Sequence, residues 1–256
     1  MLESPFAFLR GSAVVMASDL AATPTTGIDA LLCGDAHLSN FGLFATPERK
    51  LVFDINDFDE VYVGAWEWDL KRLVASAAVA GRENGFGDKF CRHIAETIAV
   101  TYRESMARFS DASTLDMWYY HVDVNEVQET LQSSMSKKGR KSSNKVIAKA
   151  RTKTQKNTLA KITEVVDGKR RITHDPPLLV PMREISKTKE IMGDGKLRQI
   201  AKSSVEDAWK QYLESLPDER RFLLRRYKAV DVAFRVGGVG SVGTRCLIVL
   251  LEARDL

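Results

Sequence analysis

The chain has 256 residues and a mass of 28.6 kDa, with 44% hydrophobic residues, 28% charged residues and a formal net charge of +4. This composition excludes an intrinsically disordered chain and is typical of a globular protein that buries a substantial core. No run approaches the roughly 18 apolar residues of a transmembrane helix, and the N-terminus lacks the basic, apolar and small-residue segments of a secretory signal. The sequence therefore predicts a cytoplasmic protein with no membrane partner.

The cysteines and most histidines give no sign of a disulfide framework or a zinc site. They are spread along the chain, without a Cys-x-x-Cys pair or histidines at metal-ligand spacing. These residues are Cys33, Cys91, Cys246, His93, His121 and His174.

The N-terminal part of the chain combines helical and strand-forming segments. Residues 6–22 predict a helix or a pair of helices, which ends at the turn-forming residues 23–27. Three short apolar runs separated by turns then predict strands. The runs cover residues 31–33, 41–44 and 51–55.

Two amphipathic helices are predicted next, over residues 68–82 and 89–109. Their apolar side chains recur at intervals of three and four residues, which is the helical period. These residues are Leu70, Leu73, Val74, Ala77, Ala78, Ile94, Ile98 and Tyr102.

The remaining segments are less regular. Helix propensity continues over residues 115–163, with an interruption around residues 136–143. Residues 172–196 are predicted to be extended or looped, because the prolines in Asp175-Pro176-Pro177 cannot donate backbone hydrogen bonds. A helical pattern returns over residues 205–227.

The stretch Gly34-Asp35-Ala36-His37-Leu38-Ser39-Asn40 is the strongest functional signal. An Asp and an Asn five positions apart, followed by Asp57 beyond an apolar strand, are the groups that phosphoryl transfer from a nucleotide requires. One carboxylate orients and deprotonates a hydroxyl, while an amide oxygen and a second carboxylate hold magnesium against the phosphates. Asp35 and Asn40 also have a purely structural interpretation, because both residue types cap turns.

Four carboxylates lie close together in the sequence after this loop, at Asp54, Asp57, Asp59 and Glu60. Such groups repel one another unless a cation neutralises them, which favours a magnesium site. A calcium loop of the EF-hand type is the rival, but its central glycine and distal glutamate are missing. We take Asp57 as the metal ligand, with Asp54 as the alternative because it ends the preceding apolar run.

The order and spacing of these residues resemble the aminoglycoside and choline phosphotransferases, relatives of the protein kinases with the loop Gly-Asp-x-His-x-x-Asn. The resemblance implies that Asp35 is the catalytic base and that Asn40 and Asp57 are magnesium ligands. It also implies a supporting role for His37, which lies between the base and the first metal ligand.

The same resemblance extends to the residues around this loop. Those families carry Asp-Leu twelve positions after the metal-binding Asp, and here Asp69 takes that place. At the start of a helix, Asp69 is expected to brace the loop. Cys33 departs from the pattern, because those families usually have histidine there. Trp66 and Trp68 flank the site, where core packing is preferred to stacking on a ligand.

A glycine-rich segment, residues 235–245, precedes an apolar run at residues 246–251. It predicts a hairpin whose backbone N–H groups bind phosphate. A strand pattern follows it, which favours a kinase-type loop over a Rossmann site. The predicted phosphate-binding residues are Gly238, Gly240, Ser241 and Gly243. Because this loop comes first in ordinary kinases, the sequence predicts a permuted order.

Over a longer span the chain resembles the bacterial domain-of-unknown-function family 2252. The resemblance is carried by residues 4–11, the Cys-Gly-Asp-Ala-His loop, residues 53–60 and residues 66–72, and is dense over residues 4–85 and 228–252. The family name implies no activity. Relatives extend beyond both ends, with a downstream strand resembling Leu-Gln-Val-Lys-Glu that would carry a phosphate-binding lysine. We therefore expect a chain truncated at both ends.

The positive charge is concentrated in residues 137–171, where thirteen Lys or Arg residues face only Glu164 and Asp167. Such a segment could bind nucleic acid through phosphate contacts. It has no aromatic residue to stack on a base, and apolar residues interleave with the lysines at helical spacing. A solvated amphipathic helix is the preferred interpretation, and nucleic acid is not an expected partner.

Together these features predict an α+β fold, mostly helical, with a protein-kinase-like phosphotransferase core in permuted order. Residues 1–256 are expected to form a single kinase-like domain with a helical insertion at residues 115–215. The predicted activity is transfer of the γ-phosphoryl group of ATP, with Mg²⁺, to a hydroxyl of a small molecule or protein. The alternative is a non-catalytic nucleotide-binding or interaction module, pseudokinase-like, because the downstream lysine strand is missing.

Overall fold

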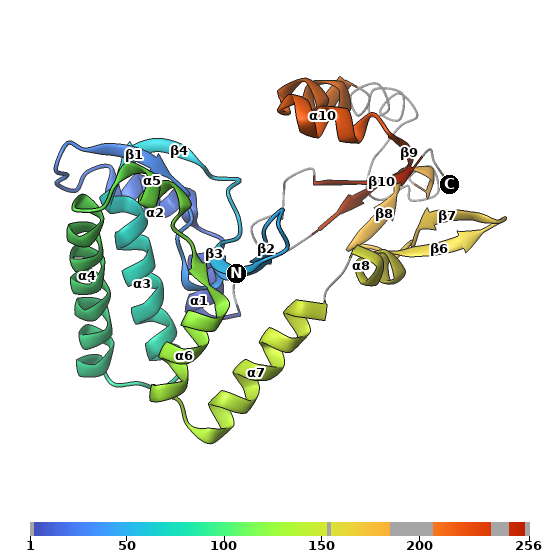
Figure 1. The fold of residues 1–256 in the computed structure, drawn as a ribbon. Helices are drawn as coiled ribbons and strands as arrows, with labels where there is room; N and C mark the ends of the chain where they lie inside the picture. Colours follow the sequence, from blue (N-terminus) through green and yellow to red (C-terminus); the bar gives the residue numbers. More distant parts are fainter. Residues whose placement is uncertain (1–2, 153–154, 185–206, 237–245, 254–256) are drawn as a thin grey trace. The chain divides into compact units, whose positions relative to one another are not determined.

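A computed structural model describes residues 3–152, 155–184, 207–236 and 246–253 (Figure 1). The described part of the chain is 52% helix and 23% strand, which confirms the α+β prediction. It divides into two compact units, Met1–Lys153 and Thr154–Leu256, which are described separately below.

The first unit begins with two short helices, α1 (Pro5–Arg10) and α2 (Ala13–Leu20), so the predicted helix pair is confirmed. The hydroxyl of Ser4 accepts a hydrogen bond from the N–H of Ala7, and Pro5 occupies the first turn. Both features favour a helix start, because the first N–H groups of a helix lack internal partners.

Two small antiparallel sheets follow, and each contains a pair of strands that are distant in sequence. One sheet pairs β1 (Asp29–Leu32) with β4 (Tyr62–Ala65). The other has the order β2-β3-β5, with a short 3-10 turn, η1 (Leu38–Asn40), leading into its first strand. Its strands are β2 (Phe41–Ala45), β3 (Leu51–Ile55) and β5 (Val122–Asp123). The predicted strands at residues 41–44 and 51–55 are thus confirmed.

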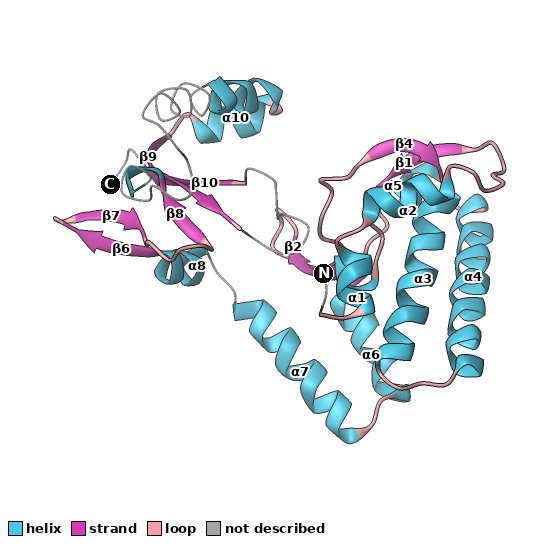
Figure 2. Cartoon of the chain, turned by 180° about the vertical axis from the view of Figure 1, so that it is seen from behind, coloured by secondary structure: helices cyan, strands magenta, loops and turns pink. Residues whose placement is uncertain are grey.

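Helices α3 (Glu67–Glu83) and α4 (Asp88–Ser110) lie side by side in both views of the chain (Figures 1 and 2), and α1 and α2 contact α3. Their bounds match the predicted amphipathic helices. Three further helices complete the unit, namely α5 (Thr114–Tyr119), α6 (Val124–Ser134) and α7 (Lys137–Thr152).

The second unit is built around an antiparallel sheet of order β10-β9-β8, drawn in magenta in Figure 2. Its core contains the buried side chains of Ile172, Leu179, Ala233 and Leu250. The elements are α8 (Gln155–Ile162), β6 (Thr163–Val166), β7 (Lys169–Ile172), β8 (Leu179–Pro181), η2 (Met182–Glu184), α10 (Asp218–Leu224), β9 (Tyr227–Arg235) and β10 (Leu247–Ala253), with residues 207–215 also helical.

Residues 115–215, predicted as a helical insertion, are helical only in part. They contain α5 to α8, but also strands β5 to β8, and they cross the boundary between the two units. The hairpin of β6 and β7 turns at Asp167 and Gly168, which have φ angles of 50° and 71°. Asp-Gly between short strands is a strong hairpin signal that outweighs the helix propensity of the flanking lysines.

Two other predictions differ in their boundaries. The expected interruption at residues 136–143 is shorter, because α7 already begins at Lys137. The helical pattern of residues 205–227 ends with α10, and Tyr227 begins β9. No helix in the described part of the chain is long and apolar enough to cross a membrane.

Candidate functional site

The predicted catalytic loop connects β1 to η1, and a glycine fixes its first turn. Gly34 has a φ of 78°, a conformation that favours glycine. A Cβ atom at this position would lie 2.1 Å from the carbonyl oxygen of Glu60. The backbone around Glu60 therefore lies directly against the loop, and no other residue type fits at position 34.

Asp69 holds the beginning of this loop. Its carboxylate accepts hydrogen bonds from the backbone N–H groups of Cys33, at 2.8 Å, and Gly34, at 3.1 Å. Burial raises the pKa of the Cys33 thiol to about 12, and the charge of Asp69 contributes. Cys33 is therefore a neutral buried thiol and no nucleophile.

A second contact from α3 holds the other end of the loop. The hydroxyl of Ser76, which is completely buried, accepts a hydrogen bond from the N–H of Leu38 at 3.0 Å and donates one to the carbonyl of Leu73 at 2.7 Å. Helix α3 therefore positions the loop at both ends.

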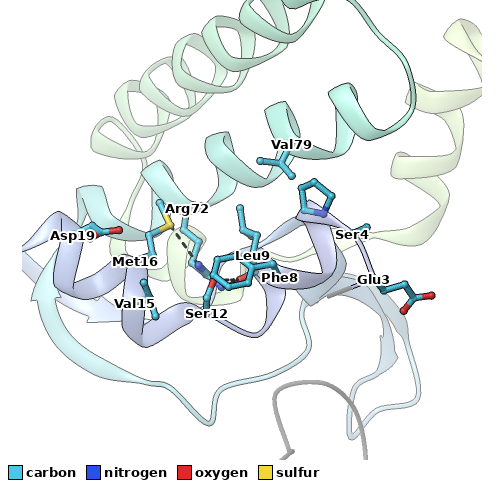
Figure 3. Close-up of a pocket in the computed structure, with 11 residues that line it drawn as sticks. Glu3, Ser4, Phe8, Leu9, Ser12, Val15, Met16, Asp19, Arg72 and Val79 are labelled. Carbon is cyan, nitrogen blue, oxygen red and sulfur yellow. Dashed lines mark hydrogen bonds between the residues drawn. The ribbon is translucent and has the colours of Figure 1, made fainter. Parts of the chain in front are cut away.

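The side chain of Asp35 is paired with a buried arginine. The Nε–H group of Arg72 donates to Oδ1 of Asp35 at 2.5 Å. Arg72 also donates to the carbonyl of Leu9 at 2.7 Å and contacts the sulfur of Met16 at 3.4 Å, as Figure 3 shows. Arg72 is only 3% exposed. One residue of α3 thus joins the loop to α1 and α2.

His37 lies on the other oxygen of the Asp35 carboxylate. Its Nε2 atom is 3.4 Å from Oδ2 of Asp35, and its ring packs edge-on against Phe6 of α1. Burial lowers the pKa of His37, so the imidazole is neutral at pH 7. A neutral ring held in this way orients a neighbouring carboxylate without adding charge.

Hydrogen bonds to neighbouring residues fix which way the side-chain amide of Asn40 points. Its side-chain Nδ2 donates to the backbone carbonyls of Asp35, at 2.9 Å, and Asp57, at 3.1 Å. Carbonyl oxygens only accept hydrogen bonds, so the atom facing them is the NH₂ group. The opposite Oδ1 atom is buried and has no hydrogen-bond partner among the described residues. The amide oxygen is thereby left without a partner on the side opposite the bonds to Asp35 and Asp57.

The carboxylates after β3 interact with one another. Burial raises the pKa of Asp57, and the neighbouring Asp59 adds to this shift. A side-chain hydrogen bond between Asp59 and Glu60 lowers the pKa of Asp59 and raises that of Glu60 to about 7. The charge of Asp35 also contributes to the shift at Glu60. These carboxylates therefore create one region of negative potential. A bound cation would reduce the repulsion between them.

Asp54, the alternative metal ligand, is exposed and accepts a hydrogen bond from the N–H of its neighbour Ile55 at 2.8 Å. The backbone of Asp57, by contrast, is bonded to Asn40. Both side chains are exposed, so the choice of Asp57 over Asp54 as metal ligand stays a prediction.

A bound metal ion requires several ligand side chains that lie close together. Within the described ranges, no group of three or more His, Cys, Asp or Glu side chains is arranged to hold a metal. Magnesium needs fewer protein ligands, because it usually keeps several waters and binds one or two carboxylates plus the substrate phosphates. The partnerless Oδ1 of Asn40 is one oxygen donor of the kind that magnesium prefers, and the residue next to it through Nδ2 is Asp57.

The structure thus brings together five of the predicted site residues, Asp35, His37, Asn40, Asp57 and Asp69. The predicted phosphate-binding residues Gly238, Gly240, Ser241 and Gly243 lie outside the described residues. The strands that flank them, β9 and β10, are paired antiparallel, as a hairpin requires.

Comparison with known proteins identifies the family of this chain. The model of a family described as "Uncharacterized protein conserved in bacteria (DUF2252)" matches residues 1–256. The chain belongs to this family. No curated protein and no solved structure gives a significant match. The predicted membership of DUF2252 is confirmed, and the chemistry rests on the geometry of the site.

Two residues of this DUF2252 site were missed by the sequence reasoning. Arg72 and Ser76 lie three and seven positions after Asp69, so all three residues share one face of α3. That spacing was the available signal. Of the two tryptophans beside the site, both are partly buried, and Trp66 stacks on Tyr102 of α4 with ring centroids 5.3 Å apart.

An open groove of about 630 Å³ borders the same arginine. Figure 3 shows the side chains of α1 and α2 that line it, together with Arg72 and Val79 of α3. Most of the lining is apolar, including Phe8, Leu9 and Met16. The groove is a feature of the helices that support the catalytic loop.

Proposed function

We propose that this DUF2252 protein transfers the γ-phosphoryl group of ATP to a hydroxyl of a small molecule or protein. The observation that carries the proposal is the orientation of Asn40, whose NH₂ group joins Asp35 to Asp57 while its buried Oδ1 stays free. The kinase-like core in permuted order is part of the same proposal. The phosphotransferase-type loop supports it, and Asp69 and Ser76 hold that loop at both ends.

Asp35 positions the acceptor. Its Oδ1 is occupied by Arg72, so Oδ2 accepts the hydrogen bond of the acceptor hydroxyl. During transfer the acceptor oxygen forms a bond to the γ-phosphorus and its proton passes to Oδ2. The bond from the γ-phosphorus to the β–γ bridging oxygen breaks, and ADP leaves with that electron pair. Positioning matters most here, because the transition state of phosphoryl transfer is loose.

Asn40 and Asp57 would hold magnesium, through the amide oxygen and the carboxylate. The ion supplies charge neutralisation for the phosphate oxygens when it is bound. Gly238, Gly240, Ser241 and Gly243 are proposed to cover the phosphates through their backbone N–H groups.

Calorimetry of ATP binding with and without magnesium tests the proposal. Binding should require magnesium and collapse in Asp57→Ala. The exposed carboxylate Asp54 supplies a matched control, and Asp54→Ala should bind as the wild type does. Asp35→Asn should retain binding but lose transfer. Absence of ATP binding to the folded wild-type chain would refute the proposal, and equal losses in both alanine variants would refute the metal assignment.

A non-catalytic nucleotide-binding module is the second candidate, and the buried pair of Asp35 and Arg72 favours it. Because this pair joins the loop to two helices, Asp35 has a structural role that needs no turnover. ADP release in the presence of candidate acceptors separates the two functions. A module of this kind would bind ATP with magnesium, yet release ADP no faster than Asp35→Asn does.

A further inference from the structure

Five buried side-chain polar atoms in the described part of the chain have no hydrogen-bond partner. They are Arg10 Nε, His37 Nδ1, Asn40 Oδ1, Glu67 Oε2 and Trp68 Nε1. All of them belong to α1, to the catalytic loop or to the first turn of α3. Buried polar atoms are nearly always paired with protein groups, water or a ligand, so each of these atoms is a candidate contact for a bound group.

Arg10 is the cation in this group. It lies in the last turn of α1, within the Ser4–Gly11 segment that resembles the family, and no part of the proposed mechanism uses it. Its side chain is partly buried and makes no hydrogen bond or ion pair with any described residue. Arg72, in comparison, is already engaged with Asp35, Leu9 and Met16.

Arg10 lies on α1, the helix that contacts the catalytic loop through Phe6. Phe6, one turn earlier on α1, packs against the ring of His37. The charge of Arg10 acts on the same ring, where it adds to the lowering of the His37 pKa that burial causes. His37 in turn contacts Oδ2 of Asp35, the oxygen assigned to the acceptor hydroxyl. Arg10, which has no partner among the described residues, therefore belongs to the helix that packs against the His37 ring, and its charge reaches that ring.

We propose that Arg10 binds the terminal phosphate of the nucleotide, an inference that rests on the proposed phosphotransferase function. Its planar fork of N–H donors matches the geometry of phosphate oxygens. In that position it neutralises charge on the oxygens of the transferred group, where charge is spread during the reaction. A basic residue at the end of a helix also interacts with the helix dipole, but that effect is small and does not require arginine.

Calorimetry of ATP and ADP binding, both with magnesium, tests this assignment in wild type, Arg10→Gln and Arg10→Lys. Arg10→Gln should weaken ATP binding about 10- to 100-fold, the loss expected for one charge-assisted phosphate contact, and change ADP binding less than about twofold. The ATP affinity of Arg10→Lys should lie between those of the wild type and Arg10→Gln. Arg103→Gln, an exposed arginine variant on α4, is the matched control and should bind both nucleotides as the wild type does.

The outcomes separate this inference from the function on which it rests. A folded wild type that binds neither nucleotide overturns both. Tight ATP binding by Arg10→Gln overturns the role of Arg10 alone. Equal losses for ATP and ADP also overturn it, because they show that Arg10 supports the loop and not the terminal phosphate. Far-ultraviolet circular dichroism and thermal melts of each variant establish that α1 stays folded.

Discussion

At the scale of single residues, the pair of Asp35 and Arg72 carries two roles at once. The carboxylate faces the proposed acceptor with one oxygen and binds a nearly buried guanidinium with the other. Removing one partner of a buried pair leaves an uncompensated charge, which costs more than the pair itself contributes. Substitutions at Asp35 therefore change stability as well as activity.

Asp35→Ala should lower the free energy of unfolding by about 3 kcal/mol, since it leaves Arg72 buried without its counter-charge. Asp35→Asn should cost less, because its amide oxygen still accepts the hydrogen bond from Nε of Arg72. Urea denaturation of the three chains measures both values. The structural role is wrong if Asp35→Ala stays within about 0.5 kcal/mol of the wild type.

Glu60 gives a pH-dependent prediction. Its pKa is about 7 in the folded chain, against 4.5 as the ordinary value, so the folded state binds more protons between these limits. Stability should therefore fall as the pH rises from about 4.5 to 7. Glu60→Gln, which cannot ionise, should become more stable than the wild type as this window is crossed, by on the order of 1 kcal/mol after solvent screening.

Thermal melts at pH 5 and pH 8, without magnesium, check the Glu60 prediction. Glu104→Gln, an exposed variant on α4, should follow the wild type at both values. If Glu60→Gln and the wild type keep the same difference at pH 5 and pH 8, Glu60 does not titrate in this range.

At the scale of elements, α3 organises the site. Asp69 and Ser76 hold the two ends of the loop, and Arg72 between them holds Asp35. The three residues share a helix face, so a rigid element positions the groups that a loop alone would leave mobile. Substitutions on this face of α3 are therefore expected to change the conformation of the loop.

Asp69→Asn should loosen the loop. An amide presents one acceptor oxygen and one NH₂ group, so it cannot accept from the N–H groups of both Cys33 and Gly34 through two oxygens. The unpaired N–H should cost about 1–3 kcal/mol. Hydrogen exchange of the segment around residues 33–34 should accelerate. Asp88→Asn, which removes an exposed carboxylate paired with Arg82, is the control and should leave exchange in this segment unchanged.

Helix periodicity and turn chemistry predicted the elements that surround the loop. The apolar spacing of residues 68–82 and 89–109 identified α3 and α4, and the short apolar runs identified β2 and β3. The strands at residues 163–172 were missed, because the segment was included in the helical insertion and its Asp167-Gly168 turn was not weighed. Pairings such as β1 with β4 depend on contacts between distant segments, which one sequence does not contain.

For the candidate site, the sequence indicated residues that the structure brings together, while their chemical roles stay predictions. The Gly-Asp-x-His-x-x-Asn spacing identified the residues of the loop, because short-range motifs survive in one sequence. The partner of Asp35 did not emerge, since Arg72 lies 37 positions away and only the fold brings the two together. The unpaired state of Arg10 was equally hidden, because an absence of partners is a property of the tertiary structure.

At the scale of the whole molecule, contacts concentrate within two units. In the second unit, Asp231 of β9 accepts hydrogen bonds from the N–H of Ile172, at 2.9 Å, and from Arg183. Its side chain is 8% exposed. This carboxylate is a local anchor, comparable to Asp35 in the first unit.

Asp231→Asn should destabilise the second unit by about 2 kcal/mol, because it removes the charge that pairs with Arg183. Hydrogen exchange followed by mass spectrometry should show faster exchange in the core strands of residues 154–256. Exchange in residues 1–153 should stay as in the wild type. Asp207→Asn, at an exposed position, serves as the control. Equal acceleration in both units would mean that the chain unfolds as one cooperative body.

The threefold engagement of Arg72 has a consequence for the history of such chains. A relative without the proposed activity would still be selected to keep Asp35 and Arg72, because losing either one leaves the other without its buried partner. The Gly-Asp pair is then a marker of ancestry more than of activity. Drift should first reach a group with no architectural role, such as the guanidinium of Arg10, whereas Asn40 is retained through the bonds of its NH₂ group to Asp35 and Asp57. Position 10 is therefore where relatives without the proposed activity are to be recognised.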